Sequence, residues 1–171
     1  MTFRTDRLIA ERLRAEDLAE LCRMHQDPRV MATLGGLRSD DQTQQFLRDN
    51  LWHWERHGFG LWMFHAQADG RFVGRGGFRH VHVGGQDEVE IAYALMAAFW
   101  GSGMATEMAK AIVTVAFEHL DRTDIVAFTL ATNQASRRVM EKVGCTFERD
   151  IVHAGLPHVL YRITREDYVT A

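Results

Sequence analysis

Apolar residues recur along the chain with two different periods, and their alternation predicts a mixed α/β fold. Helical spacing of apolar residues is found over 17–25, 40–57, 104–120 and 136–143, so each of these segments is expected to bury one helix face. Alternating or continuously apolar runs predict strands over 8–13, 61–67, 71–81, 88–95, 125–131, 147–153 and 158–163. The resulting order, β-α-α-β-β-β-α-β-α-β-β, suits a mixed sheet with helices on both faces.

Residues that cap helices or form turns mark the ends of these segments. Ser39 with Gln42 three residues later is typical of a helix N-cap, and Gly58 is expected to end the same helix. The run Ala68-Asp69-Gly70 predicts a tight hairpin between two strands. We expect Pro28 to close the first helical region and Gly155-Leu156-Pro157 to form the last turn.

Composition indicates an ordinary globular chain and argues against several function classes. The 171 residues hold two prolines and no linker-like segment, so a single domain over 1–171 is expected. A net charge of −3 gives no sign of a nucleic-acid surface, and no stretch approaches a membrane span. Cys22 and Cys145 form no disulfide framework, which favours the cytoplasm. His80 and His82 have no third ligand nearby in the sequence, so no metal is expected.

A glycine turn before the long helix is the most informative segment of the chain. It consists of Trp100, Gly101, Ser102, Gly103, Met104, Ala105 and Thr106. The first amides of a helix have no internal partner and the helix dipole is positive there, so small residues at this point favour binding of a diphosphate. The simpler reading is a tight strand-to-helix turn. The segment lacks the Lys-Ser/Thr of a P-loop and the third glycine of a Rossmann turn.

The same segment resembles the signature Q/R-x-x-G-x-G/A of the GNAT superfamily of N-acyltransferases, with Trp100 in the Gln/Arg position. The other matching blocks are Glu90-Ile91-Ala92-Tyr93, Asn133-Gln134-Ala135-Ser136 and Glu141-Lys142-Val143-Gly144-Cys145-Thr146-Phe147. Their order and spacing are similar to the branch that acetylates the N-termini (alanine or serine) of ribosomal proteins. The resemblance extends from Thr5-Asp6-Arg7-Leu8 to Leu160-Tyr161.

The resemblance implies a fold and a cosubstrate, acetyl-CoA. The implied fold is a single-domain, largely antiparallel sheet that splays open where the strands ending near Leu95 and Asn133 part. The pantetheine arm is expected to pair with the backbone of Leu95, Met96 and Ala97, and Asn133 to hydrogen-bond the pantetheine amides. The diphosphate is expected at the glycine turn, which makes Trp100 through Thr106 cofactor-binding residues.

Two residues are candidates for catalysis. Glu90 shares a strand face with small residues and is a candidate base for the amine; the alternative is a solvated glutamate at a strand end. Relatives use a tyrosine on the short helix to protonate the thiolate, and its position here holds Met140, which has no proton to donate. Ser136 is the substitute candidate for contact with the sulfur; the alternative is a hydroxyl that satisfies a backbone amide at the helix start.

The expected function is transfer of an acetyl group from acetyl-CoA to a primary amine by direct attack on the thioester. A peptide N-terminus is the first acceptor class by resemblance, and polyamines or aminoglycosides come next. A CoA-binding module without turnover and an unrelated phosphate-binding α/β domain stay open as alternatives. Both an acetyl group and a longer acyl chain stay open as the group carried, and both a monomer and a homodimer stay open as the assembly.

Overall fold

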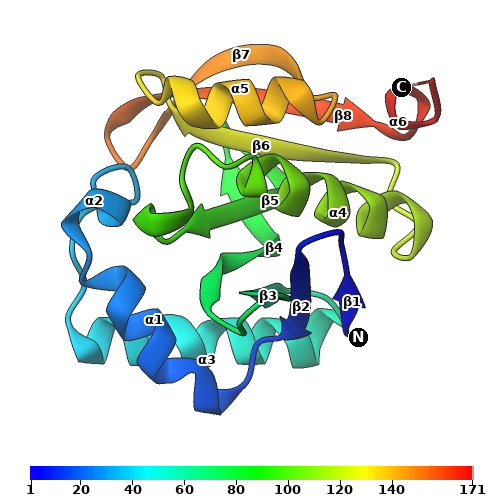
Figure 1. Ribbon diagram of the computed structural model, residues 1–171. Helices are drawn as coiled ribbons and strands as arrows, with labels where there is room; N and C mark the ends of the chain where they lie inside the picture. Colours follow the sequence, from blue (N-terminus) through cyan, green and yellow to red (C-terminus); the bar gives the residue numbers. More distant parts are fainter. Residues whose placement is uncertain (171) are drawn as a thin grey trace. The chain divides into compact units, whose positions relative to one another are not determined.

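The computed structural model describes residues 1–170 and divides the chain into two compact units (Figure 1). The first unit contains Met1–Gly77 and Tyr93–Met108, and the second contains Phe78–Ala92 and the described residues from Ala109 onward. Strands β4 and β5 and helix α4 each contribute residues to both units. The two units are therefore described one after the other.

The helices and strands have the following bounds. The helices are η1 (Ala15–Asp17), α1 (Leu18–His25), α2 (Pro28–Met31), α3 (Asp40–His57), η2 (Ala97–Phe99), α4 (Met104–Glu118), α5 (Gln134–Lys142) and α6 (Arg165–Thr170). The strands are β1 (Phe3–Arg4), β2 (Leu8–Arg12), β3 (Leu61–Ala66), β4 (Phe72–Val83), β5 (Gln86–Leu95), β6 (Asp124–Leu130), β7 (Thr146–His153) and β8 (Leu156–Thr164).

Within residues 1–170 the strands follow the order β1-β2-β3-β4-β5-β6-β8-β7 in one sheet. In the first unit β1, β2, β3 and β4 pair antiparallel in sequence order. In the second unit β5 runs parallel to β6, with Glu90 opposite Val126, and β8 pairs antiparallel with both β6 and β7. The predicted mixed, largely antiparallel sheet is confirmed.

Helices α1 and α3 lie side by side in the first unit (Figure 1) and bury their apolar faces. The fully or nearly fully buried side chains of this unit include Leu8, Leu21, Met24, Leu47, Trp54, Leu61 and Phe64. Helix α3 begins with the predicted capping box: the Ser39 hydroxyl accepts from the Gln42 amide at 3.2 Å and the Gln42 side chain accepts from the Ser39 amide at 2.9 Å. It ends at Gly58, whose φ of +74° is left-handed.

The second unit is built around the antiparallel strands β6, β8 and β7, with α5 beside them (Figure 1). Val83, Val126, Ile151 and Leu160 form a buried cluster on these strands and the end of β4. Continuous burial of residues 125–127 in β6 matches the apolar run that predicted this strand. The order and type of the elements expected for this unit are confirmed.

The proline at residue 28 starts a helix instead of closing one. Asp27 is the N-cap of α2, because its carboxylate accepts from the Arg29 amide at 2.9 Å, and Pro28 occupies the first turn. Proline has no N–H, and the first helical position needs none, so it is well tolerated there. Helix α1 does end before Pro28, at His25, but the prediction missed the short helix that Pro28 begins, because proline ends helices in their interior yet fits at their start.

The last turn is shorter than predicted. Ala154 and Gly155 form it with positive φ values of 50° and 73°, and Leu156 and Pro157 already belong to β8. Two residues with positive φ match the right-handed twist of a hairpin. Strand β1 and helix α6 were not predicted, since two and six residues are too few to show a period.

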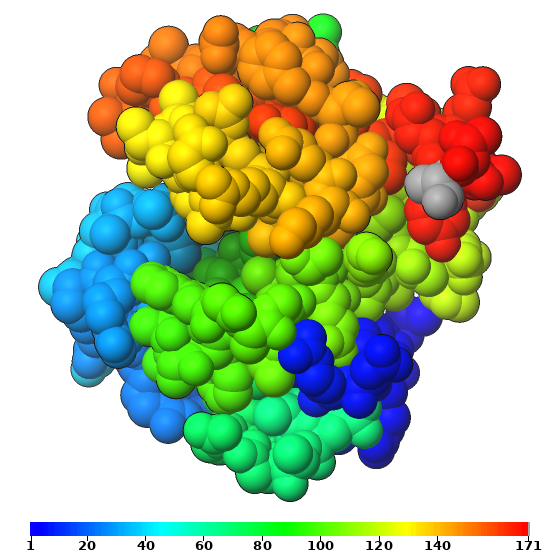
Figure 2. All heavy atoms as spheres, turned by 45° about the horizontal axis from the view of Figure 1, so that its top comes forward, coloured from blue at the N-terminus to red at the C-terminus, as the bar shows by residue number. Residues whose placement is uncertain are grey.

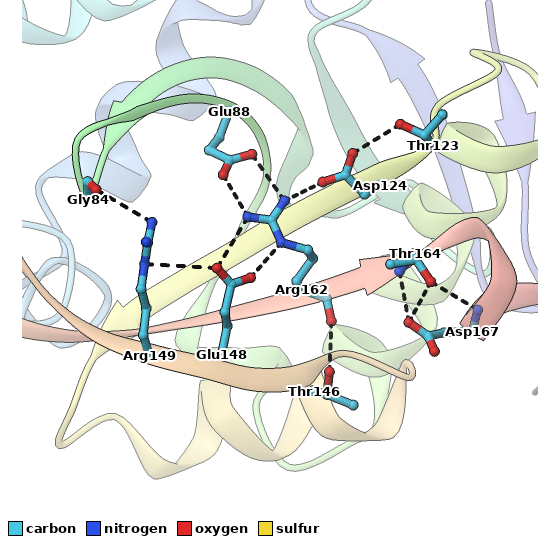
Figure 3. Close-up of polar contacts among 10 residues, drawn as sticks. All are labelled: Gly84, Glu88, Thr123, Asp124, Thr146, Glu148, Arg149, Arg162, Thr164 and Asp167. Atoms are coloured by element: carbon cyan, nitrogen blue, oxygen red, sulfur yellow. Dashed lines mark hydrogen bonds and ion pairs between the residues drawn. The ribbon is translucent and has the colours of Figure 1, made fainter.

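A four-strand ion cluster centres on Arg162 of β8 (Figure 3). Its guanidinium lies 2.7 Å from a Glu88 carboxylate oxygen and 2.5 Å from one of Glu148, and it also pairs with Asp124. Hydrogen bonds to Glu88, Glu148 and Asp124 raise the pKa of Arg162 above its ordinary value. One cation thus holds three carboxylates from β5, β7 and β6.

Replacing Arg162 by methionine is expected to lower the free energy of unfolding by about 2 kcal/mol, between the values typical of exposed and buried pairs. The reason is that Glu88, Asp124 and Glu148 would face one another without a cation. Arg149→Met is the matched control, because its weaker contact with Glu148, at 3.9 Å, is expected to contribute little. Urea denaturation measures both, and equal losses would contradict the central role of Arg162.

The stability of the first unit should depend on pH through His25. This ring is fully buried, lies 3.0 Å from the Thr43 hydroxyl, and packs edge-on against Phe46. Burial, together with the positive charges of Arg75 and Arg38, lowers the pKa of His25 from 6.5 to about 3. The folded state therefore keeps the ring neutral while the unfolded chain takes up a proton, so stability falls as pH drops from 6.5 towards 3.

The test compares His25→Gln, which can still bond Thr43, with the wild-type chain. The wild-type advantage in unfolding free energy should shrink on acidification, at most by about 1.4 kcal/mol per pH unit. Urea denaturation at neutral pH and at about pH 5 measures the difference. A constant advantage across this range would show that folding does not lower the pKa of His25, and would contradict the prediction.

Candidate cofactor and active site

The glycine turn forms a sharp corner between η2 and α4 in the first unit. Gly101 and Gly103 have positive φ values of 71° and 81°, a conformation that glycine adopts without steric cost. The Ser102 hydroxyl donates to the Phe99 carbonyl at 2.6 Å and so fixes the corner from within. Residues 100–103 are exposed, and α4 begins at Met104 as predicted.

The first amides of α4 meet the requirement for an anion site. Among residues 1–170, no side chain accepts a hydrogen bond from the amides of Gly103 through Thr106. A Cβ built on Gly101 would meet nothing within 4 Å, and one on Gly103 would meet only the Arg7 Nη2 atom, at 3.6 Å. The residues present therefore fit a diphosphate, because the donors are unsatisfied and the backbone can be approached closely.

The backbone at the end of β5 is partly engaged already. The Met96 amide donates to the Val73 carbonyl of β4 at 2.8 Å. The carbonyls of Met96 and Ala97 accept from the amides of Phe99 and of Trp100, the residue that follows η2. Successive residues of a strand point their N–H and C=O groups to opposite edges, so those of Leu95 face away from β4. Of the three residues expected to pair with pantetheine, Leu95 has the best placed backbone.

Trp100 contacts this same strand end. Its indole N–H donates to the Leu95 carbonyl at 3.1 Å, while 53 % of the residue is exposed. The indole therefore occupies the acceptor that an added pantetheine amide would use. Trp100 stands in the Gln/Arg position of the signature. Its hydrogen bond to the Leu95 carbonyl could not be predicted from the periodicity or motif spacing of the sequence.

A shallow cavity of about 360 Å³ lies beside the same segment of the first unit. It is lined by Glu20, Arg23, Gly70, Arg71, Phe72, Met96, Ala98 and Phe99. The Arg71 guanidinium lies over the Phe99 ring, 5.2 Å from its centroid. Met96 therefore lines a surface hollow with charged neighbours, while its amide bonds the Val73 carbonyl of β4.

The N-terminal turn also contacts α4, which the sequence did not predict. Figure 2 shows the blue N-terminal segment directly against the green segment that contains the glycine turn. Arg7 donates through Nε to Glu107 at 2.6 Å and through Nη1 to the Ser102 carbonyl at 2.9 Å. Thr5 donates its hydroxyl to Glu107 at 2.5 Å. Burial acts to raise the pKa of Glu107, but these hydrogen bonds from Thr5 and Arg7 lower it overall.

Glu90 belongs to the second unit and is buried, with 2 % of the residue exposed. Its carboxylate forms an ion pair with Arg79 of β4. The solvated glutamate considered as the alternative is therefore wrong. Small neighbours on the strand face allowed the prediction of an open carboxylate, but the arginine comes from another strand, and one sequence does not show that pairing.

Asn133 and Ser136 lie together at the start of α5 in the second unit. The Asn133 side chain caps the helix by accepting from the Ser136 amide at 3.2 Å, and it donates to the Thr129 hydroxyl at 3.1 Å. Part of the hydrogen-bonding capacity of Asn133 is thus structural. Met140 on the same helix is buried, with 2 % exposed, so it packs in the core.

Cys145, which follows α5, has no features of a nucleophile. It is 4 % exposed, and burial raises the pKa of the Cys145 thiol to about 12. A thiol that stays protonated and covered neither attacks a thioester nor binds a metal.

The predicted site residues fall into two groups. The turn (Trp100 to Thr106) and the strand end (Leu95 to Ala97) belong to the first unit, and Glu90, Asn133 and Ser136 belong to the second.

Among residues 1–170, no helix is both long and apolar enough to cross a bilayer.

Comparison with known proteins agrees with this geometry. Residues 7–146 match the family model described as "Acetyltransferase (GNAT) domain". The uncharacterized protein YkkB of Bacillus subtilis is 29 % identical over 158 residues, which is 92 % of each chain. An acetyltransferase structure from Agrobacterium tumefaciens strain C58 superimposes with a TM-score of 0.83 at 26 % identity, over 95 % of this chain and 94 % of that one.

Structures from different GNAT branches share the fold. One is RimL, a ribosomal L7/L12 α-N-protein acetyltransferase in complex with coenzyme A, with a TM-score of 0.81, 18 % identity and coverage of 96 % and 98 %. Another is spermidine N-acetyltransferase from Vibrio cholerae, with a TM-score of 0.78, 13 % identity and coverage of 96 % and 99 %. Below 25 % identity these likenesses concern the fold. The chain belongs to the GNAT family and is an acyl-CoA-dependent N-acetyltransferase.

Proposed function

We propose that the protein transfers an acetyl group from acetyl-CoA to the α-amine of a peptide or protein, in the manner of the branch that acetylates ribosomal-protein N-termini. Binding of the cofactor is supported by one observation: the backbone amides at the start of α4, next to Gly101 and Gly103, have no side-chain acceptor among the described residues. GNAT acetyltransferases use acetyl-CoA and act on amine acceptors, so the family supports the reaction type.

The cofactor would be held by backbone groups of the first unit. The amides from Gly103 to Thr106 would bind the diphosphate, because an anion complements both their N–H groups and the helix dipole. The Leu95 backbone would pair with a pantetheine amide as an added strand does. For this, the ligand must share or displace the Trp100 indole on the Leu95 carbonyl. Asn133 would add a hydrogen bond through its remaining amide hydrogen.

The chemistry requires a neutral amine and stabilisation of an oxyanion. The attacking nitrogen forms a bond to the thioester carbon, loses a proton, and expels the thiolate of CoA. Glu90 is the proposed base for that proton, with Arg79 fixing its carboxylate. The Leu95 amide is the proposed oxyanion donor, since the Met96 amide is committed to Val73.

Protonation of the departing thiolate needs little help from the protein. A free thiol has a pKa of about 8.5, so its thiolate is a good leaving group. Met140 has no proton to give, and Ser136 is the proposed contact for the sulfur. The amine's own proton, passed on through Glu90 or solvent, balances the reaction.

The acceptor class follows from the same chemistry. At pH 7.4 about a quarter of an α-amine with a pKa near 7.8 is neutral, against about 0.1 % of an amine with a pKa near 10.4. A base that is buried and ion-paired, as Glu90 is, suits the acceptor that needs less deprotonation. This favours a peptide N-terminus over a polyamine or an aminoglycoside.

A thiol-release assay tests the proposal. The protein is mixed with acetyl-CoA and a panel of peptides with different first residues, with spermidine and an aminoglycoside as the small-amine arms. Free CoA thiol that appears only with peptides is the expected result. Release only with a small amine would move the acceptor to that class, and CoA binding without release for any acceptor would make the protein a cofactor-binding module.

A further inference from the structure

The structure assigns a role to Arg7, a residue outside the GNAT signature: we propose that it is a positioning residue that holds the phosphate-binding turn in its ligand-binding orientation. The inference rests on the proposed function, since it concerns the same cofactor site. It starts from three contacts within the first unit, which join the β1–β2 turn to the start of α4.

The first step concerns the hydrogen bonds that hold the Arg7 guanidinium against Glu107. Arg7 Nε lies 2.6 Å from one oxygen of Glu107, and the Arg7 backbone amide donates to the other oxygen at 2.8 Å. Thr5 donates its hydroxyl to that second oxygen, and its own hydroxyl oxygen accepts from the Leu8 amide at 3.0 Å. Glu107 is 15 % exposed and Arg7 is 44 % exposed. The carboxylate thus accepts three hydrogen bonds, and its bond to Arg7 Nε holds the guanidinium in place.

The second step concerns the peptide between Ser102 and Gly103. Arg7 Nη1 donates to the Ser102 carbonyl at 2.9 Å. No peptide bond in the described chain is cis, so the C=O of Ser102 and the N–H of Gly103 point in opposite directions. Because the carbonyl is held towards Arg7, the N–H of Gly103 is directed away from the guanidinium.

The third step is why this turn needs such a hold. Two positive-φ glycines flank Ser102, and glycine leaves the backbone free to rotate. A rotation of the Ser102–Gly103 peptide would replace a donor by a carbonyl oxygen at the anion site. An oxygen facing a diphosphate repels it, so one peptide orientation binds and the other opposes binding. Arg7 selects the first by its bond to the carbonyl.

The experiment compares a ligand that uses the turn with one that lacks a diphosphate. Arg7→Met should raise the Kd for CoA and lower kcat/KM for acetyl-CoA by about tenfold or more, the value of one hydrogen bond to a charged group. For S-acetylpantetheine, kcat/KM should change by no more than about twofold, since this substrate has no diphosphate. Arg7→Lys, whose single ammonium lacks the rigid fork that joins Glu107 to the Ser102 carbonyl, should fall between the two.

Arg4→Met is the matched control, because Arg4 is an exposed arginine of the same N-terminal segment whose described contact is with Gln67, at 3.3 Å. It should leave both substrates unaffected. If Arg7→Met does not fold, Arg7→Lys carries the same comparison. Equal losses for both substrates, or no loss for CoA, would overturn the role of Arg7. Failure of the wild-type protein to bind CoA would instead overturn the proposed function.

Discussion

Gly103→Glu is expected to abolish CoA binding, with a rise in Kd of about a hundredfold or more from charge repulsion and a blocked donor. A Cβ at this position would lie 3.6 Å from the Arg7 Nη2 atom, and no other described atom beyond its chain neighbours would be within 4 Å, so the substitution does not disturb packing. The added carboxylate would stand at the start of α4, close to the amides proposed to bind the diphosphate, and would repel it. Calorimetric titration with CoA measures the change directly.

Gly85→Glu provides the control for backbone strain. Gly85 has a φ of +79°, against +81° for Gly103, and nothing lies within 4 Å of its built Cβ. Both variants therefore carry the same new charge and the same conformational cost. CoA binding that is weakened equally in both would mean that strain, and not occupation of the phosphate site, explains the loss.

Glu90→Gln is expected to lower kcat by about 10²–10⁴-fold, the range typical of a removed general base. Glutamine keeps the size of the side chain and can still accept from Arg79, but it cannot take a proton from the amine. The loss should be largest near neutral pH and smaller at alkaline pH, where more of the acceptor is already neutral. Steady-state rates of thiol release from pH 6 to 9 provide the measurement.

Glu88→Gln is the matched comparison for this variant. Glu88 lies two residues away on the same strand face, and it too pairs with an arginine, Arg162, at 2.7 Å. Its substitution should cost some stability and leave kcat within about threefold, since a carboxylate held in the Arg162 cluster has no part in proton transfer. If Glu90→Gln kept kcat/KM unchanged across the pH range, the base would have to be water or another group.

Much of the fold could be predicted because its signals are local. The capping box at Ser39 and Gln42 and the positive-φ glycine at residue 58 set the ends of α3 through contacts between neighbours in the chain. The start of α4 at Met104 followed from the glycine turn in the same way. Each of these features depends on a few consecutive residues, so one sequence contains the needed information.

Contacts between distant segments could not be predicted in the same way. Arg7 and Glu107 are a hundred residues apart, and nothing in either neighbourhood specifies the other. Likewise, the partner of Glu90 comes from β4, and the arginine of the four-strand cluster comes from β8. The sequence does show Glu107 in the first turn of a helix, and Thr5 and Arg7 near the start of the chain. Pairing these residues requires knowing how the strands are arranged in the sheet.

In the ligand-free protein, the indole N–H of Trp100 already occupies the Leu95 carbonyl for which a pantetheine amide would compete. A pantetheine amide that pairs with the Leu95 carbonyl exchanges one donor for another, so the net gain from that contact is smaller than a new hydrogen bond would give. The same exchange moves an exposed tryptophan into different surroundings. Titration of CoA should therefore be visible in the intrinsic fluorescence of the protein, with no label attached.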